Sequence, residues 1–477
     1  MFSNIIKVAI RNLIRQLGYT LINILGLAIG LACSILIFLY VLNEVTYDRF
    51  HEKAENIYRI GVRGQMMGNE LNQAVTAAPM MEALLNDYPE VEMAVRLASF
   101  GGWLVTYEEK KFHETDETFK FADSTFFEVF NFKLLRGDPK TVLTRPRTIV
   151  LTESAARKYF GDEDPIGKSV KVEQDTILYE VTGLMENVPV NSHFHFDMLG
   201  SMSSIRRSRS TNWLNHEYYT YVVLPAGIDI EKFTQSINEM IPKYVGPLIE
   251  QYLGFSLEQF EAAGNTFGYF LMPMLDIHLH SDLQVEIEPG GNPTYVYIFS
   301  LIAVLILIIA CINFMNLATA RSITRAREVG LRKVVGSHRS YLISQFLTES
   351  VFLSLISMVL AIILVYLFLP YYNNMVRLDL EFNILNNYFT IPLILLLAIF
   401  VGLLAGGYPA FVLASFNPVT VMKGELVSGT GKGLLRSILV ILQFTVTIAI
   451  LIGTFIVYRQ LSYMQKKELG FQKNNAK

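Results

Sequence analysis

The chain has 477 residues, of which 52% are hydrophobic and only 17% are charged. Ordinary globular proteins carry about 25% charged residues, and the mean hydropathy here is +0.35, so a wholly soluble protein is excluded. The formal net charge of -3 provides no basic field, which leaves nucleic-acid binding without electrostatic support.

Five stretches of the sequence contain no Asp, Glu, Lys or Arg and are long enough to cross a membrane. About 20 apolar residues span the ~30 Å of a bilayer's hydrocarbon core. The stretches are residues 21–42, 297–318, 351–369, 391–413 and 438–457. The sequence therefore predicts a membrane α-helical fold with five transmembrane helices.

The charges that flank the spans predict their orientation, because cytoplasmic loops are enriched in Lys and Arg. Residues 1–20 carry three basic residues and no acid, whereas Glu44 and Asp48 follow the first span. We therefore expect a cytoplasmic N-terminus and an extracytoplasmic segment 43–293. The segments expected in the cytoplasm after later spans are residues 319–350 and 414–437. The tail, residues 458–477, is basic although the fifth span should end outside.

A cleavable signal peptide is the competing interpretation of the first span. Its charge-free run exceeds the roughly 7 to 15 residues of a signal peptide's apolar region, and no Ala-x-Ala-like site follows it. We therefore expect the first span to remain as a membrane anchor.

Residues 43–293 mix strand and helix patterns. The alternation at residues 103–108, followed by a turn at 109–110, predicts a β-hairpin. Thr152 can cap a helix that ends before Gly161. We expect a large α+β domain inserted between the first and second transmembrane helices.

A phosphate-binding loop is the most tempting motif in this domain. Gly161 precedes Gly167-Lys168-Ser169, but the spacing is one residue too long and the acids at 162–164 would repel phosphate. No ordered set of Ser, His and Asp and no close carboxylate pair stands out. We expect no catalytic residue, no cofactor and no ATP-binding site in this chain.

Two histidine pairs leave a metal site open as an alternative. His193-x-His195 and His278-x-His280 would each place two imidazoles on one face of an extended strand. A closed zinc site needs two further ligands, and a strand edge near solvent explains the pairs equally well. We expect no metal.

Polar and small residues inside the spans predict contacts between helices. The amides of Asn23, Asn313, Asn316 and Gln443 should seek partners across helices rather than face lipid. Gly26 and Gly30 form a G-x-x-x-G pattern that allows close helix approach.

The segment after the second span carries an amphipathic pattern, Arg-Ala-Arg-Glu-Val-Gly-Leu-Arg-Lys-Val-Val-Gly from residue 325. On a helical wheel Arg325, Glu328 and Arg332 share one face, whereas Gly330 and Val334 fall opposite. One interpretation is an interfacial helix whose basic side chains reach anionic lipid headgroups. The other is a docking helix for a cytoplasmic partner.

Several motifs occur along the chain in one order. They are residues 9–13, 26–30 and 47–51, then 159–161 with 164–168, then 327–333, and finally 408–410 with 417–418 and 423–424. In this order, the chain resembles the permease subunit of an FtsX-like, MacB-type ABC transporter with a MacB-like periplasmic core domain.

The resemblance implies a bacterial inner-membrane location and a separate cytoplasmic ATPase subunit. In that family the loop between the second and third spans contacts the ATPase, and by position this role falls on Arg325, Arg327, Glu328, Gly330, Arg332 and Lys333. Motion driven by ATP would pass to the outside domain, which pushes or releases substrate (mechanotransmission). Consistent with this, no charged residue within a span marks a polar substrate path.

The fifth span resembles the first helix of a second repeat, so we expect a truncated sequence completed by a second permease half or by a homodimer. A translocated domain after this helix would also relax the charge rule for the tail. Further expected partners are membrane lipid and a periplasmic protein. Two other functions stay open: a non-transporting, ATPase-driven regulator of a cell-envelope enzyme or signalling partner, and a membrane metalloenzyme built on the histidine pairs.

Overall fold

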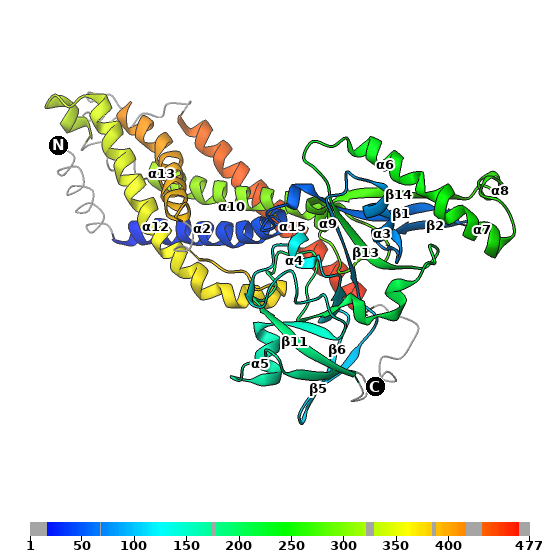
Figure 1. Ribbon diagram of the computed structural model, residues 1–477. Helices are drawn as coiled ribbons and strands as arrows, with labels where there is room; N and C mark the ends of the chain where they lie inside the picture. Colours follow the sequence, from blue (N-terminus) through cyan, green and yellow to red (C-terminus); the bar gives the residue numbers. More distant parts are fainter. Residues whose placement is uncertain are drawn as a thin grey trace. The chain divides into compact units, whose positions relative to one another are not determined.

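The structure is a computed structural model that describes residues 17–66, 68–172, 177–320, 329–383, 388–415 and 432–466. These residues form two compact units (Figure 1). The first, the membrane unit, comprises the described residues up to Val41 and from Tyr297 onward. The second, the inserted domain, is Leu42–Val296.

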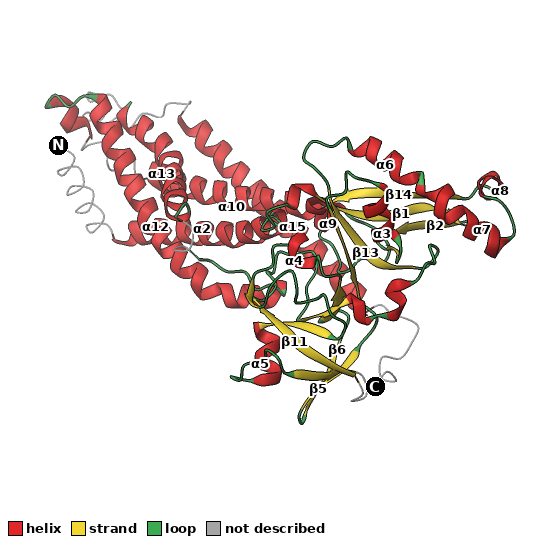
Figure 2. Ribbon diagram, viewed as in Figure 1, coloured by secondary structure: helices red, strands yellow, loops and turns green. Residues whose placement is uncertain are grey.

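Five helices among the described residues are long and apolar enough to cross a membrane, as predicted (Figure 2). They are α2 (Leu17–Val45), α10 (Pro293–Ala320), α12 (Arg339–Val376), α13 (Thr390–Ala414) and α15 (Lys432–Lys466), the candidate span in α15 being Ser437–Gln460. Helix α10 begins at a proline, whose missing N–H costs nothing in the first turn.

Helix α12 begins well before the charge-free stretch that starts at residue 351. Glu349 is only 6% exposed, and its Oε1 accepts a hydrogen bond from Gln345 Nε2 at 3.4 Å. A buried carboxylate with a donor one turn away is compatible with a continuous helix. A span defined by the absence of charged residues therefore excludes Glu349 and places the start of this helix too late.

Small and polar residues bring the membrane helices together. A Cβ on Gly30 of α2 would lie 2.5 Å from Ala310 Cβ of α10, which confirms the predicted close approach. Gly402 of α13 is equally close to α12, since its Cβ would lie 2.6 Å from Val351 Cα. Asn316 donates to Gln443 across α10 and α15 at 3.3 Å, as expected of a polar side chain in a span. Asn23 differs, because it donates to the Tyr19 carbonyl of its own helix.

The inserted domain contains one 14-stranded mixed sheet in the order β14-β1-β13-β4-β7-β12-β9-β11-β10-β5-β6, with β2, β3 and β8 paired to β1, β13 and β11. The pairs β11/β9 and β12/β7 are parallel. The strands are β1 (Ile57–Met66), β2 (Asn69–Gln73), β3 (Thr76–Ala77), β4 (Met93–Ala98), β5 (Trp103–Tyr107), β6 (Lys110–Glu114), β7 (Phe119–Ala122), β8 (Leu134–Arg136), β9 (Thr148–Thr152), β10 (Ser169–Val172), β11 (Ile177–Met185), β12 (Met198–Ser201), β13 (His216–Val223) and β14 (Thr266–Pro273).

Helices surround this sheet and complete three hydrophobic cores. Helices α3, α6, α7 and α8 pack on one core with β1 and β13, whereas α5 packs on a second core with β9 and β12. A third core is rich in phenylalanine, including Phe126, Phe130 and Phe194. The helices are α3 (Met80–Asp87), α4 (Phe126–Val129), α5 (Glu153–Phe160), α6 (Ile230–Asn238), α7 (Gly246–Leu253), α8 (Leu257–Ala262), α9 (Met274–His280) and the short turns η1 (Ala54–Asn56), η2 (Met202–Ser204), η3 (Arg206–Arg209) and η4 (Ile241–Val245).

Two local predictions for this domain, the β-hairpin and the capped helix, are confirmed. Strands β5 and β6 form the expected hairpin, and Tyr107 pairs with Lys110 beside the turn. The Thr152 side chain accepts a hydrogen bond from the Ala155 N–H at the start of α5, and Gly161 ends that helix with a positive φ of 64°.

Candidate functional site

The predicted docking helix lies in the segment between α10 and α12, residues 321–338, which we call the coupling segment. Arg325, Arg327 and Glu328 lie outside the described residues, whereas Gly330, Arg332 and Lys333 lie within them. Residues 329–334 are helical. The structure thus gives geometry for half of the predicted contact residues.

A glycine terminates this helix and orients the chain into α12. Gly336 has a φ of 100°, its N–H donates to the Lys333 carbonyl at 3.1 Å, and the Ser337 N–H donates to the Arg332 carbonyl at 3.0 Å. These two bonds form a Schellman motif, which satisfies carbonyls that a helix end leaves unpaired. The chain then enters α12 after only residues 337–338, so the helix and α12 are joined by a tight turn.

One face of the helix is buried against the membrane unit. Val329 is 2% exposed, Gly330 is also buried, and Val329 shares a hydrophobic cluster with residues of two other helices. These are Leu342 and Phe346 of α12 and Ala410, Leu413 and Ala414 of α13. The coupling segment therefore packs on both α12 and α13.

Two cationic side chains anchor the helix on either side of this apolar contact. Arg332 Nη1 donates to Gln345 Oε1 of α12 at 2.8 Å. Lys333 Nζ donates to the Ala414 carbonyl, the last residue of α13, at 2.8 Å, where the helix dipole favours a positive charge. Burial, together with the nearby Arg339, lowers the pKa of Lys333.

Three further apolar residues of this segment are exposed. The exposed fractions of Leu331, Val334 and Val335 are 58%, 68% and 82%. Val334 is exposed although the wheel places it on the same face as the buried Gly330. It lies one turn after Gly330, beyond the part of the helix that packs on α12 and α13 through Val329.

A second group of residues lies in the inserted domain, where α2 ends and α10 is about to begin. Glu44 Oε2 is 3.0 Å from His278 Nε2, and the Tyr47 ring stacks on the His278 imidazole with centroids 3.3 Å apart. The Gly291 N–H, just before α10, donates to the His278 carbonyl at 2.7 Å. His278 therefore touches both chain segments that connect the inserted domain to spans. We call this contact the His278 junction.

Asp48 reinforces the junction from inside the domain. It is fully buried and has a φ of 59°; its Oδ1 lies 2.9 Å from His193 Nδ1, and its N–H donates to the Asn191 carbonyl at 2.8 Å. His193 Nε2 in turn lies 2.7 Å from the Tyr221 hydroxyl of β13. The motif at residues 47–51 thus fastens the end of the first span to the sheet.

The histidine pairs do not share faces as the metal alternative required. His193 pairs with Asp48, while His195 Nδ1 pairs with Glu288 at 2.8 Å. His278 and His280 lie on the helix α9 rather than on a strand, and His280 is exposed. Among the residues that the structure describes, no group of three or more His, Cys, Asp or Glu side chains could hold a metal ion.

Comparison with known proteins identifies both parts of the chain. The model of the MacB-like periplasmic core domain matches residues 20–240, and the model of the FtsX-like permease C-terminal domain matches residues 300–418. The chain belongs to the FtsX-like, MacB-type permeases of ABC transporters. Membership of this family makes it a multi-pass membrane permease, and both matched parts are permease parts.

Relatives of this permease include proteins named macrolide export ATP-binding/permease protein MacB. That of Campylobacter jejuni (strain 81-176) is 30% identical over 146 residues, covering 31% of this chain and 22% of the relative. That of Pasteurella multocida is 22% identical over 310 residues, covering 64% of this chain and 42% of the relative. The chain thus matches less than half the length of these two relatives.

Two solved structures similar to part of this chain are isolated domains. A domain of a putative permease protein from Porphyromonas gingivalis is 23% identical with a TM-score of 0.41, covering 52% of this chain and 98% of that domain. The periplasmic region of MacB from Actinobacillus actinomycetemcomitans is 17% identical with a TM-score of 0.32, covering 47% and 91%.

Proposed function

We propose that the chain is the membrane subunit through which a separate cytoplasmic ATPase drives an ABC transporter, and that the ATPase binds the coupling segment. The observation that carries this proposal is the two-sided character of the short helix. Val329 packs on α12 and α13 and Gly330 is buried, whereas Leu331, Val334 and Val335 are exposed. Exposed apolar residues gathered on one face are typical of an interaction site.

This assignment divides the predicted contact residues into two roles. Leu331, Val334 and Val335 contact the ATPase, and Arg325, Arg327 and Glu328, which lie outside the described residues, stay predicted contacts. Gly330, Arg332 and Lys333 hold the segment against the membrane helices, and the bonds to Gln345 and to the Ala414 carbonyl support this role. A displacement of the segment would then act on α12 and α13 together.

The His278 junction supports transmission to the inserted domain. Helix α2 ends at Val45 and α10 begins at Pro293. Glu44, in the last turn of α2, and Gly291, just before α10, both contact His278. His278 belongs to α9, which follows β14 directly. A relative movement of the two spans would therefore act on the edge of the sheet, and we propose that this movement exports or releases a substrate.

We propose a bacterial inner-membrane location from the family, and the charge distribution supports an N-terminus in the cytoplasm. The coupling segment contains Arg321, Arg325, Arg327, Arg332 and Lys333 against one acid, Glu328. Such an excess of basic residues favours the cytoplasmic side. We therefore propose that the coupling segment lies on the side where ATP is available and that the inserted domain lies outside.

The test is co-expression of the full chain with candidate cytoplasmic ABC ATPases, followed by measurement of copurification and ATPase rate. Val334→Glu and Leu331→Glu should each reduce the recovered complex about tenfold or more, because burying an unpaired carboxylate at an interface costs a few kcal/mol. Leu178→Glu is the matched control, since Leu178 is 54% exposed in the inserted domain.

Substitution of an anchor residue tests the transmission of motion separately from the binding of the ATPase. Lys333→Met should leave the complex intact but reduce the effect of the permease on the ATPase rate, because it removes the bond to the Ala414 carbonyl. The proposal is wrong if no ATPase copurifies with the unmodified chain. It is also wrong if the two glutamate variants copurify as well as the Leu178→Glu control.

A further inference from the structure

The inserted domain contains a cleft of about 490 Å³ that the proposed function does not use. Ligand sites in proteins commonly have volumes of about 300–1,000 Å³ and combine an apolar lining with a few polar groups. Tyr219 of β13 and Val285 contribute apolar surface, and Lys120 of β7 and Arg207 of η3 contribute positive charge. The cleft therefore has the size and the mixed lining of a small-molecule site.

The carboxylates that line the cleft already have donors within the protein. Asp116 Oδ1 accepts from Ser99 Oγ at 2.6 Å and from the Gly101 N–H at 2.7 Å. Both oxygens of Glu286 accept from Arg59 at 2.6 Å.

The third carboxylate, Glu217, is held by a cation of the same cleft. Glu217 Oε2 lies 3.6 Å from Arg207 Nη1. Glu286 and Glu217 are thus each paired with an arginine, and Asp116 accepts from two neutral donors.

Among the cationic groups that line the cleft in the described part of the chain, Lys120 is the one without a paired counter-charge. The residue is 2% exposed, and its Nζ donates to the Asp116 carbonyl at 2.6 Å. Within the described ranges, no carboxylate oxygen lies at ion-pair distance from Nζ. An ammonium has three donors, and a buried charge without a counter-charge is costly.

The pKa of Lys120 agrees with this geometry. Burial lowers it, and the more distant carboxylates of Glu288, Asp116 and Glu117 offset burial only in part. A ligand anion beside Nζ would supply the missing charge.

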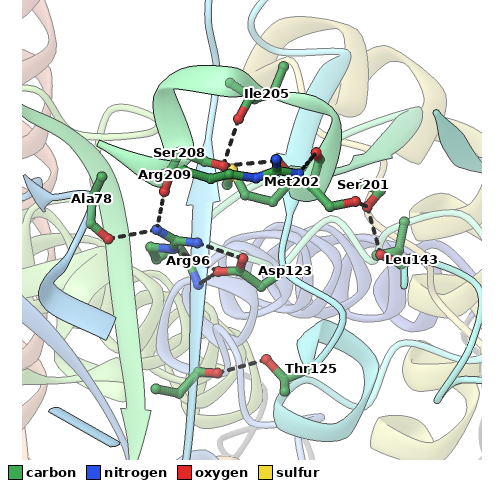
Figure 3. A network of polar contacts seen from close by, with 12 residues as sticks. Ala78, Arg96, Asp123, Thr125, Leu143, Ser201, Met202, Ile205, Ser208 and Arg209 are labelled. Carbon is green, nitrogen blue, oxygen red and sulfur yellow. Dashed lines mark hydrogen bonds and ion pairs between the residues drawn. The ribbon is translucent and has the colours of Figure 1, made fainter. Parts of the chain in front are cut away.

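Arg207 is held in a fixed position at the rim of the cleft. Its guanidinium lies over the Phe100 ring, 4.3 Å from the centroid. The turn that carries it is fastened by Arg96, whose Nη1 donates to the Ser208 carbonyl at 2.9 Å and to the Ala78 carbonyl at 2.6 Å (Figure 3). Figure 3 also shows Asp123 orienting Arg96 from the other side. A second cation is therefore positioned before any ligand arrives.

We propose that this cleft binds a small organic carboxylate with an aromatic or aliphatic body. The carboxylate contacts Lys120 Nζ, and the body packs on Val285 and Tyr219. Hydrogen bonds from a cation to a carboxylate are stronger than those between neutral groups. The charge, rather than shape alone, would therefore select the ligand.

The test compares two probes that differ only in charge, N-acetylphenylalanine and its neutral amide, on the full chain purified in detergent. Saturation-transfer NMR titrations give both dissociation constants. The carboxylate should bind about tenfold more tightly than the amide. Lys120→Met should abolish this preference, whereas Lys140→Met, which changes an exposed lysine outside the cleft, should retain it.

Arg207→Gln provides a second test that does not alter the buried lysine. The Arg207 side chain is 54% exposed, and the variant should weaken binding of the carboxylate several-fold while the amide is unaffected. The proposal is overturned if neither probe binds, if both bind the unmodified chain equally, or if the preference survives Lys120→Met.

Discussion

Gly291 occupies a position in the His278 junction where a methyl group does not fit. A Cβ at this position would lie 2.6 Å from Glu44 Oε2 and 2.8 Å from His278 Nε2. Gly291→Ala must therefore separate these two groups or shift the backbone that leads into α10. We expect a loss of about 1–3 kcal/mol in the free energy of unfolding, from overpacking and the lost hydrogen bond.

Urea unfolding followed by tryptophan fluorescence measures this change, because both tryptophans, Trp103 and Trp213, belong to the inserted domain. Gly246→Ala is the control, since a Cβ there would meet its nearest neighbour at an ordinary 3.7 Å. Equal stability of the two variants would contradict the tight packing of the junction.

Sequence reasoning found the residues of this junction but not their arrangement. The His pairs were open to a metal or a structural interpretation because spacing alone predicts which residues share a strand face. The partners of His278 and His193 are Glu44 and Asp48, more than a hundred residues away in the chain. Contacts of this kind depend on the tertiary fold, and a single sequence carries no local signal for them.

At the scale of elements, the turn between the coupling segment and α12 depends on Gly336. Its φ of 100° is a conformation that L-residues with a Cβ rarely adopt. Gly336→Ala should weaken the Schellman motif by about 1–2 kcal/mol. Hydrogen exchange measured by mass spectrometry should then show about tenfold faster exchange or more in peptides covering residues 332–337.

Gly407→Ala in α13 is the control for this prediction, since no atom lies within 4 Å of a Cβ at that glycine. Unchanged exchange at residues 332–337 in Gly336→Ala would show that the turn does not depend on the glycine. The measurement needs no ATPase and is therefore independent of the proposed function.

The sequence predicted those helices and strands whose formation depends on residues close together in the chain. The Thr152 cap, the hairpin of β5 and β6, and the five apolar helices follow from backbone chemistry and hydrophobicity, and the structure has all of them. The exposed face of the coupling helix was not predictable, because it depends on how far α12 and α13 reach. The cleft around Lys120 was missed for the same reason, since its lining comes from strands and loops far apart in sequence.

At the scale of the whole molecule, the buried His51 and the half-buried His216 make the stability of the inserted domain depend on pH. Burial lowers the pKa of His51 and of His216 to about 4. In the unfolded chain both take up a proton as the pH falls through about 6.5, whereas in the folded chain they stay neutral until about 4. The unfolded state therefore binds more protons between these values, and the free energy of unfolding falls as the pH falls.

His195 and Glu288 do not disturb this window. Burial alone would lower the pKa of His195, but the bond to Glu288 outweighs it and raises that pKa. A raised histidine pKa contributes stability that is fully present below about 6.5 and is lost only at higher pH. Burial would raise the pKa of Glu288, but the bond to His195 lowers it, so its contribution is lost only below about 4.5.

Between pH 6.5 and 5.0, His51 and His216 together should therefore lower the free energy of unfolding by about 3 kcal/mol. Urea titrations followed by tryptophan fluorescence at several pH values measure this slope. His51→Gln should reduce the slope by about half, whatever its effect on stability at pH 7, whereas His280→Gln, at an exposed position, should leave it unchanged. An unaltered slope in His51→Gln would mean that His51 already takes up its proton in the folded domain, against the burial that the structure gives it.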